Sequence, residues 1–198
     1  LPMGELVHLL RSKAVLMPGV SVTLTNEKNK DVQQWQYKGG LKDYLSQTLV
    51  AEPVIPLLEG EGYADKHNET FSEGEGAAWC LAFTELGAPM RESYVNLIPT
   101  TAGGTHESGL RDGLFQAVKG FIELHALCPK GVKLMPDDVF ARASFVLSAK
   151  VLDPQFQGQV KEKLNSRDAV RLVSGFVKPA MELWLNANVE HGKKLAEL

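Results

Sequence analysis

Cysteine is scarce in this chain of 198 residues, which has only Cys80 and Cys128. The two lie far apart, with no histidine or cysteine at metal-ligand spacing, so a zinc ribbon and a disulfide scaffold are excluded and a reducing compartment is indicated. No apolar run approaches the ~18 residues that a membrane span needs, and there is no signal-peptide pattern. We therefore expect no membrane partner.

The common phosphate-binding and catalytic motifs are also missing. There is no Gly-x-x-x-x-Gly-Lys-Ser/Thr loop, no Gly-x-Ser-x-Gly turn and no His-Glu-x-x-His helix. The five histidines make no metal-ligand pattern. His106 stands beside a loop and Glu107, but a histidine at a helix start more often packs or bonds locally than acts as an acid or base. By its residue pattern the chain is not a complete enzyme, and it has no metal site.

The net charge of −3 hides an asymmetry. Residues 52–75 carry seven acids and one base, a balance of −6, whereas the remaining 20 bases and 17 acids give +3. One acidic segment therefore sets the sign, and we interpret it as a solvated loop. The net charge does not exclude a partner as acidic as DNA.

What is present is enough for a buried core. The chain is 44% hydrophobic and 23% charged, which is ordinary for a globular protein. Its length allows one domain, or one domain and a piece of another. The opening Leu1-Pro2-Met3-Gly4 is not a natural start, so we expect a piece of a longer protein.

Hydrophobic periodicity predicts an alternation of strands and helices. Thr105 and Ser166 are expected N-caps, and Pro179 should kink or divide the last helix. The order predicts an α/β fold, specifically an α+β two-layer sandwich of a mixed sheet with helices on one face. We expect helices at 5–17, 41–49, 106–125, 137–141 and 166–190. We expect strands at 20–24, 33–37, near 54–58, and at 77–84, 92–98 and 144–152.

Two segments stand out, residues 96–111 and 153–164. In the first, Gly103-Gly104 allows a close turn just before a helix; alone, this is mostly a strand-to-helix connection. In the second, Gln159 and Lys161 lie on a loop between a buried strand and a helix. Lysine is a compact cation on a long stem, suited to a phosphate oxygen, and an amide could donate to the same group. Alone, however, a lysine in a loop is usually just solvated.

Together these segments resemble the B subunits of bacterial type IIA topoisomerases, nearer the topoisomerase IV branch than gyrase. The similarity covers nearly the whole chain and is weakest in residues 52–75. A Gly-Gly-Thr-His helix start followed by this lysine loop is a specific pairing. The segments that carry the resemblance are 98–111, 130–134, 147–156 and 159–164.

The resemblance implies a domain division and a fold. Residues 1–39 would be the last helix and hairpin of an ATPase domain, and residues 40–198 a transducer domain. That transducer fold is similar to a domain of a small-subunit ribosomal protein and has a left-handed βαβ crossover. Since crossovers are right-handed in about 98% of cases, this expectation comes from the resemblance alone.

The family's loop is Gln-Thr-Lys, which implies that Gln159 and Lys161 contact the terminal phosphate of ATP; Val160 departs from the family threonine. With ATP bound, Lys161 would lock the transducer against the ATPase domain, and loss of that phosphate would release it. The general base, the Mg²⁺ site and the adenine pocket would lie outside this chain. The chain alone is then expected neither to hydrolyse ATP nor to bind it tightly.

The resemblance also implies partners: DNA, the A subunit of topoisomerase IV, and a second copy of the B subunit, in an A2B2 enzyme of the bacterial cytoplasm, associated with the nucleoid. ATP hydrolysis would drive strand passage, decatenation and relaxation of DNA. For any one basic residue, a solvated surface is as good an interpretation as contact with DNA. The candidates to face DNA are Arg111, Lys119, Lys130, Lys133, Arg142, Arg171 and Lys178.

Three alternatives remain open. The B subunit of gyrase is the alternative most similar to the main interpretation. Another is a middle domain from the same ATPase superfamily, as in mismatch-repair or chaperone proteins, which also place a lysine in a neighbouring nucleotide site. The Gly-Gly-Thr-His segment favours the topoisomerase branch. The last is a nucleic-acid-binding module without ATP coupling, which predicts a concentrated basic or aromatic surface; the scattered bases do not favour it.

Overall fold

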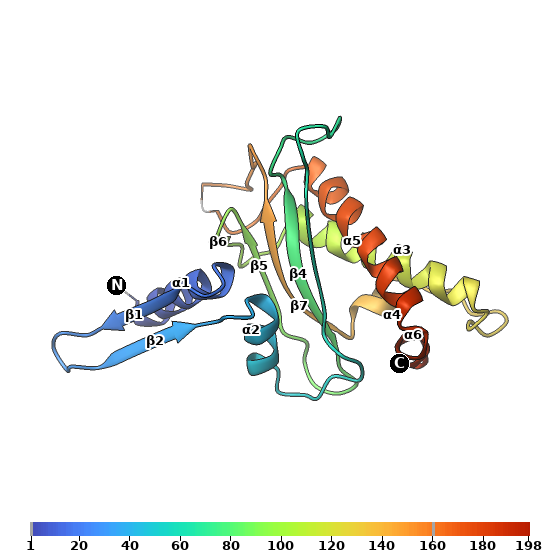
Figure 1. Ribbon diagram of the computed structural model, residues 1–198, viewed down its shortest axis with the longest axis horizontal. Coiled ribbons are helices and arrows are strands. Elements are labelled where there is room, and N and C mark those ends of the chain that lie inside the picture. Colours follow the sequence, from blue (N-terminus) through green and yellow to red (C-terminus); the bar gives the residue numbers. More distant parts are fainter. Residues whose placement is uncertain (1, 160) are drawn as a thin grey trace. The chain divides into compact units, whose positions relative to one another are not determined.

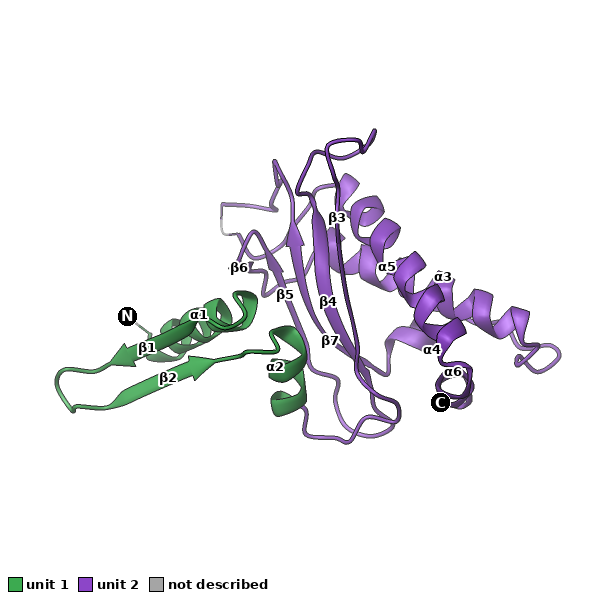
Figure 2. Ribbon diagram, viewed as in Figure 1, with its two compact units in different colours: residues 1–48 green, residues 49–198 purple. Residues whose placement is uncertain are grey.

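A computed structural model describes residues 2–159 and 161–198 of the chain and divides it into two compact units. The first ends at Thr48 and the second is Leu49–Leu198 (Figure 2). The boundary between compact units thus lies after the 41–48 helix, whereas the predicted functional boundary lies after residue 39. The functional assignment of the domains stays a prediction.

The first unit is a helix, a hairpin and a second helix. Its elements are α1 (Met3–Leu16), β1 (Ser21–Thr25), β2 (Val32–Gln36) and α2 (Leu41–Thr48). They confirm the predicted helices and hairpin. Within this unit, Arg11 Nε donates to the Tyr37 hydroxyl at 2.7 Å. The Tyr37 and Tyr44 rings meet edge to face, with centroids 5.5 Å apart.

The second unit is built on a mixed five-stranded sheet (Figure 1). Its order is β3-β4-β7-β5-β6, and every pairing is antiparallel except that of β5 with β7. The chain therefore crosses from β5 to its parallel neighbour β7 through α3 (Thr105–Leu124) and α4 (Pro136–Phe140). The left-handedness of this crossover stays a prediction. The strands are β3 (Leu58–Tyr63), β4 (Gly76–Phe83), β5 (Arg91–Val95), β6 (Ile98–Pro99) and β7 (Ala143–Lys150).

Helices α3 and α5 lie on the same side of this sheet (Figure 1), which confirms the predicted two-layer sandwich. They approach closely because α3 presents glycines to α5. A Cβ on Gly109 would lie 2.7 Å from the Val170 carbonyl oxygen, and one on Gly113 would lie 3.1 Å from Ser174 Cα. The helices are α3 (Thr105–Leu124), α4 (Pro136–Phe140), α5 (Asp168–Ala187) and α6 (Val189–Glu197).

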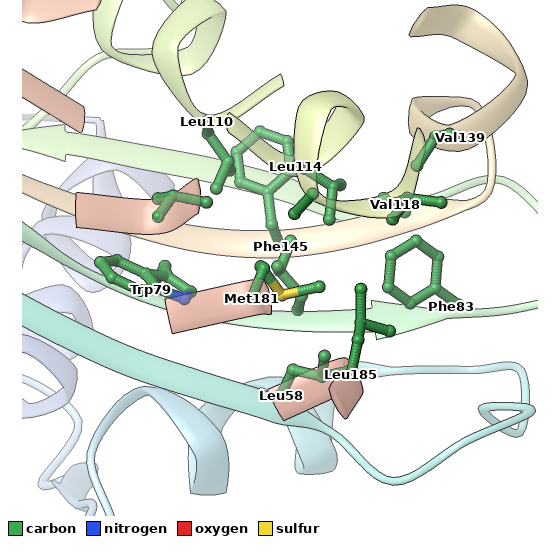
Figure 3. Close-up of a cluster of buried hydrophobic side chains, with 14 of the residues drawn as sticks. Leu58, Trp79, Phe83, Leu110, Leu114, Val118, Val139, Phe145, Met181 and Leu185 are labelled. Atoms are coloured by element: carbon green, nitrogen blue, oxygen red, sulfur yellow. The ribbon is translucent and has the colours of Figure 1, made fainter. Parts of the chain in front are cut away.

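The hydrophobic core fills the space between the sheet and these helices (Figure 3). Trp79, Phe83 and Phe145 on the strands face Leu114 on α3 and Met181 on α5. Each of the five is at most 2% exposed. Burying one such side chain stabilises the fold by about 1.5–3 kcal/mol, so this layer holds the strands and helices that carry the site.

The strand predicted near 54–58 was misplaced, because the strand runs from Leu58 to Tyr63 within the acidic segment. This strand alternates glycine and glutamate rather than apolar and polar residues. The glycines are needed for packing: a Cβ on Gly60 would lie 2.6 Å from the Trp79 ring, and one on Gly62 would lie 2.4 Å from the Phe176 ring. The acidic segment is therefore partly an edge strand rather than a loop throughout.

Two predictions about helix ends were also wrong. Thr105 is the first helical residue, and the cap position before it is Gly104, so no side chain caps α3. Helix α5 begins only at Asp168, and the Ser166 hydroxyl instead accepts the N–H of Gln155 at 2.8 Å. Pro179 lies inside α5 and does not divide it, since the break comes at Asn188; the kink that was the other expectation for this proline stays a prediction.

Candidate functional site

The segment of residues 153–165, which we call the lysine loop, lies between β7 and α5, and those of its residues that the structure describes form no helix or extended strand, as predicted. Its two arms meet where Phe156 forms an antiparallel bridge with Leu164. Leu164 is 1% exposed and packs in a small cluster with Val95 and Ala169. The loop is therefore closed at its base.

The returning arm of the lysine loop is bonded to the start of α3. Ala102 N–H donates to the Glu162 carbonyl at 2.9 Å, and Leu164 N–H donates to the Gly103 carbonyl at 3.1 Å. Thr105 N–H donates to the Leu164 carbonyl, also at 3.1 Å. The structure thus brings together the two segments that the sequence singled out, although no pattern had predicted that they would be bonded to each other.

Gly104 makes this docking sterically feasible. Its φ of +143° is one that side chains rarely adopt, and a Cβ there would lie 2.4 Å from the Leu164 carbonyl oxygen and 2.6 Å from the Leu164 nitrogen. Any other residue would push the loop away from the helix start. The glycine pair is therefore a docking point for the lysine loop as well as a connection.

The tip of the loop carries the predicted phosphate contacts. Gln159 and Lys161 are both exposed, and Gly158 turns the chain with a φ of +79°. The Lys161 ammonium lies 6.0 Å from the Phe156 ring centroid. Among residues 2–159 and 161–198 it has no ion pair, so it is available to an anion. Val160, the departure from the family threonine, lies outside the described residues.

A buried polar chain lies beneath the docking point. His106 is 0% exposed, and its Nε2 lies 2.9 Å from Thr100 Oγ1. That hydroxyl lies 2.7 Å from Ser93 Oγ, which donates to Glu107 Oε1 at 2.5 Å. The expectation that His106 bonds locally is confirmed. Neither Ser93 nor Thr100 was predicted, and the polar residues Arg91 and Glu92 beside Ser93 on the same strand give it no distinguishing pattern.

The charge states of His106 and Glu107 determine which group donates and which accepts in each of these hydrogen bonds. Burial lowers the pKa of His106 to about 4, so the ring is neutral at pH 7. Burial raises the pKa of Glu107, whereas the Ser93 hydrogen bond and the charge of Arg91 lower it. With Glu107 ionised, Ser93 donates to it and Thr100 donates to Ser93. His106 must then carry its proton on Nε2, which leaves Nδ1 as the buried atom without a partner.

The seven predicted DNA-facing bases fall into two groups. Four have partners within the chain: Arg111 pairs with Asp137, Lys119 with Glu123, Lys178 with Glu182, and Arg142 donates to the Glu85 carbonyl. Lys130, Lys133 and Arg171 are exposed and have no ion pair in the part of the chain that the structure describes. Exposed ion pairs contribute only about 0–1 kcal/mol, but the unpaired bases are the ones already available to a phosphate.

Neither a metal centre nor a membrane segment occurs in the described ranges. No group of three or more histidine, cysteine, aspartate or glutamate side chains is placed there to hold a metal ion. None of the helices found there combines the length and the apolar character that crossing a bilayer requires.

Comparison with known proteins gives a consistent result. A family model described as DNA gyrase B matches residues 40–198. The B subunit of DNA topoisomerase 4 from Salmonella typhimurium is 45% identical over 98% of this chain, and that from Pseudomonas aeruginosa is 46% identical over the same share. The chain spans 30% of the length of each of these relatives.

Solved structures agree. The topoisomerase IV ATP-binding domain of Francisella tularensis, solved with a small-molecule inhibitor, is 34% identical with a TM-score of 0.79, over 100% of this chain and 52% of that one. The 43K ATPase domain of Thermus thermophilus gyrase B has a TM-score of 0.80 over 98% of this chain and 51% of that one; at 21% identity it supports the fold alone. The chain therefore belongs to the DNA gyrase B family, as its resemblance to the B subunits of type IIA topoisomerases predicted.

Proposed function

We propose that this chain is the transducer part, with the end of an ATPase domain, of the B subunit of an ATP-dependent topoisomerase IV. Residues 1–39 would end the ATPase domain and residues 40–198 would form the transducer. The proposal is supported by relatives named as B subunits of DNA topoisomerase 4, which are 45% identical over 98% of this chain. The whole enzyme would couple ATP binding and hydrolysis to strand passage, decatenation and relaxation of DNA.

The observation that carries the proposal is a loop with a fixed base and an exposed tip. The base is bonded to the start of α3 through Ala102, Gly103 and Thr105, while the tip presents Lys161 and Gln159. A loop held in this way can couple the binding of a ligand at its tip to the position of the helices and sheet to which its base is bonded. An ammonium without an ion pair fits a terminal phosphate, to which a charge-assisted hydrogen bond can form.

In this proposal ATP supplies the phosphoryl group whose presence and loss drive the cycle. Lys161 binds the terminal phosphate, and the side-chain amide of Gln159 donates a hydrogen bond to the same phosphate. The transducer is therefore held against the ATPase domain while that phosphate is present. When the phosphate is lost, the ammonium loses its partner and the transducer is released. The general base and the Mg²⁺ ligands belong to the rest of the enzyme, so the chain alone has no ATPase activity.

The partners in this A2B2 enzyme are DNA, the A subunit of topoisomerase IV and a second copy of the B subunit. The enzyme acts at the nucleoid in the bacterial cytoplasm. Lys130, Lys133 and Arg171 are the first candidates to contact DNA, because they have no ion pair within the described residues. The B subunit of gyrase is the second candidate for the whole protein, since the matching family model is described as DNA gyrase B.

ATP turnover by the complete enzyme tests the proposal. Lys161→Ala should lower kcat by about 10- to 100-fold, the size expected for one charge-assisted hydrogen bond. Lys163→Ala is the matched control, since it removes an exposed lysine from the same loop and should leave kcat within about twofold of the wild type. An unchanged kcat in Lys161→Ala would overturn the proposed role of the loop.

A further inference from the structure

The departing arm, which we define as the residues Val151 and Leu152 that lead from β7 into the lysine loop, is held by side chains far away in the sequence. Asn96 lies in the turn between β5 and β6. Its Nδ2 donates to the Val151 carbonyl at 2.8 Å, and its Oδ1 accepts the Val151 N–H at 3.0 Å. The amide thus pairs with both backbone groups of Val151, where β7 has just ended. In effect, one side chain extends the β5–β7 ladder by a residue.

The next residue of this arm is held by an acid. Glu75 Oε1 accepts the N–H of Leu152 at 2.9 Å, while its Oε2 accepts the N–H of Ser72, also at 2.9 Å. Glu75 is the last acid of the segment 52–75, and here it fastens the loop that precedes β4 to the end of β7. Val151 and Leu152 are therefore fixed from two sides immediately before the lysine loop begins.

The turn that presents Asn96 is strained. Asn96 and Leu97 have φ values of 49° and 66°, and they are the two central residues of the hairpin between Val95 and Ile98. Asparagine tolerates the left-handed region, but leucine adopts it at a cost. Strained conformations persist where the surroundings hold them, and they concentrate at functional sites. Here the strained turn aims an amide at the root of the lysine loop.

The same segment, residues 96–105, thus holds both arms of the loop. Asn96 holds the departing arm at Val151, and the backbone of residues 102–105 holds the returning arm at Glu162 and Leu164. We propose that Asn96 is a positioning residue for Lys161, in that it fixes where the lysine loop leaves the sheet and thereby the reach of its tip. This inference rests on the proposed contact of Lys161 with the terminal phosphate.

Loss of the Asn96 amide should act on the chemical step. The departing arm would be free to move while the returning arm stays bonded to α3, so Lys161 would lose its fixed placement. A displacement of about 1 Å from productive geometry can cost on the order of 100-fold in rate. Since two further groups, Glu75 and the returning arm, still hold the loop, a smaller loss of about tenfold in kcat is expected.

The experiment measures ATP turnover by the complete enzyme carrying Asn96→Gly. Glycine keeps the left-handed turn and removes only the amide, so the melting temperature should stay within a few degrees of the wild type. Leu97→Asn is the matched control: it changes the neighbouring turn residue, suits the same backbone region and keeps the Asn96 amide. We expect kcat to fall about tenfold in Asn96→Gly and to be unchanged in Leu97→Asn.

A double-mutant cycle with Lys161→Ala separates positioning from a general structural role. If Asn96 acts through Lys161, adding Asn96→Gly to Lys161→Ala lowers kcat no further. If the two losses multiply, or if Asn96→Gly alone leaves kcat unchanged while Lys161→Ala lowers it, the positioning role is overturned. If Lys161→Ala itself leaves kcat unchanged, the proposed function fails first.

Discussion

Gly104 lies directly against the backbone of Leu164, so that a Cβ on Gly104 would come within 2.4 Å of the Leu164 carbonyl oxygen. This contact joins the start of α3 to the returning arm of the lysine loop. It connects two positions that are separated in the sequence by two helices, a strand and most of the loop.

Gly104→Ala should detach the lysine loop from α3. The substitution combines a φ of +143° with a clash against backbone, which cannot rotate away as a side chain can. We expect a loss of stability of about 2–4 kcal/mol, together with faster hydrogen exchange of the Leu164 and Thr105 amides, measured by mass spectrometry or NMR.

Gly120→Ala is the control for this change. Gly120 lies within α3 and has nothing within 4 Å of where its Cβ would be. Alanine there should stabilise the helix by about 0.4–1 kcal/mol. Equal protection of the Leu164 amide in Gly104→Ala and in wild type would show that the contact does not hold the loop.

His106 makes stability depend on pH. Its pKa is about 4 in the folded chain and 6.5 ordinarily, because burial disfavours the charged ring. Between these values the unfolded chain binds the extra proton and the folded chain does not, so stability is lost as pH falls from 6.5 towards 4. The full difference corresponds to about 3 kcal/mol.

Denaturant titrations of wild type and His106→Gln across this range measure the effect. Glutamine cannot titrate, so its stability profile should be flatter between pH 4 and 6.5. Glu107 acts in the opposite direction, since its raised pKa means that stability is lost as pH rises through that pKa; because Glu107 is present in both proteins, its effect cancels in the comparison. Parallel profiles would contradict a buried neutral His106.

Binding of DNA should depend on the unpaired bases. Lys130→Glu, Lys133→Glu and Arg171→Glu, each made in the full-length protein, should weaken binding and reduce the slope of log K against log salt by about one unit per lost phosphate contact. Lys66→Glu makes the same change of charge within the acidic segment and should alter neither quantity. A slope that none of the three changes would exclude these residues from the DNA surface.

Much of the fold followed from hydrophobic periodicity. Helix α3 was predicted almost to its ends because Leu110, Leu114 and Phe121 recur on one face, and β7 because it is mostly apolar. Strand β3 was misplaced because Gly60 and Gly62 make room for aromatic rings on other elements. The need for glycine comes from the aromatic side chains on the neighbouring elements, so the strand itself lacks the apolar–polar alternation that would predict it.

The residues of the candidate site could be proposed from the sequence, but the contacts between them could not. Gln159 and Lys161 were identified through the resemblance, and Gly103-Gly104 through its turn chemistry. The bonds that join these segments depend on sheet register, which places Asn96 beside Val151 although 55 positions separate them. Ser93 and Thr100 were missed for the same reason, since nothing in their local sequence indicates that His106 and Glu107 lie beside them.

The central claim, that Lys161 contacts the terminal phosphate of ATP, is tested most directly by labelling amines in the full-length protein. Treatment with a lysine-acylating reagent, followed by mass spectrometry, measures the reactivity of Lys161, with Lys163 as the control in the same loop. We predict that a non-hydrolysable ATP analogue protects Lys161 but not Lys163, and that ADP, which lacks the terminal phosphate, protects neither. Equal labelling of Lys161 with and without the analogue would contradict the account.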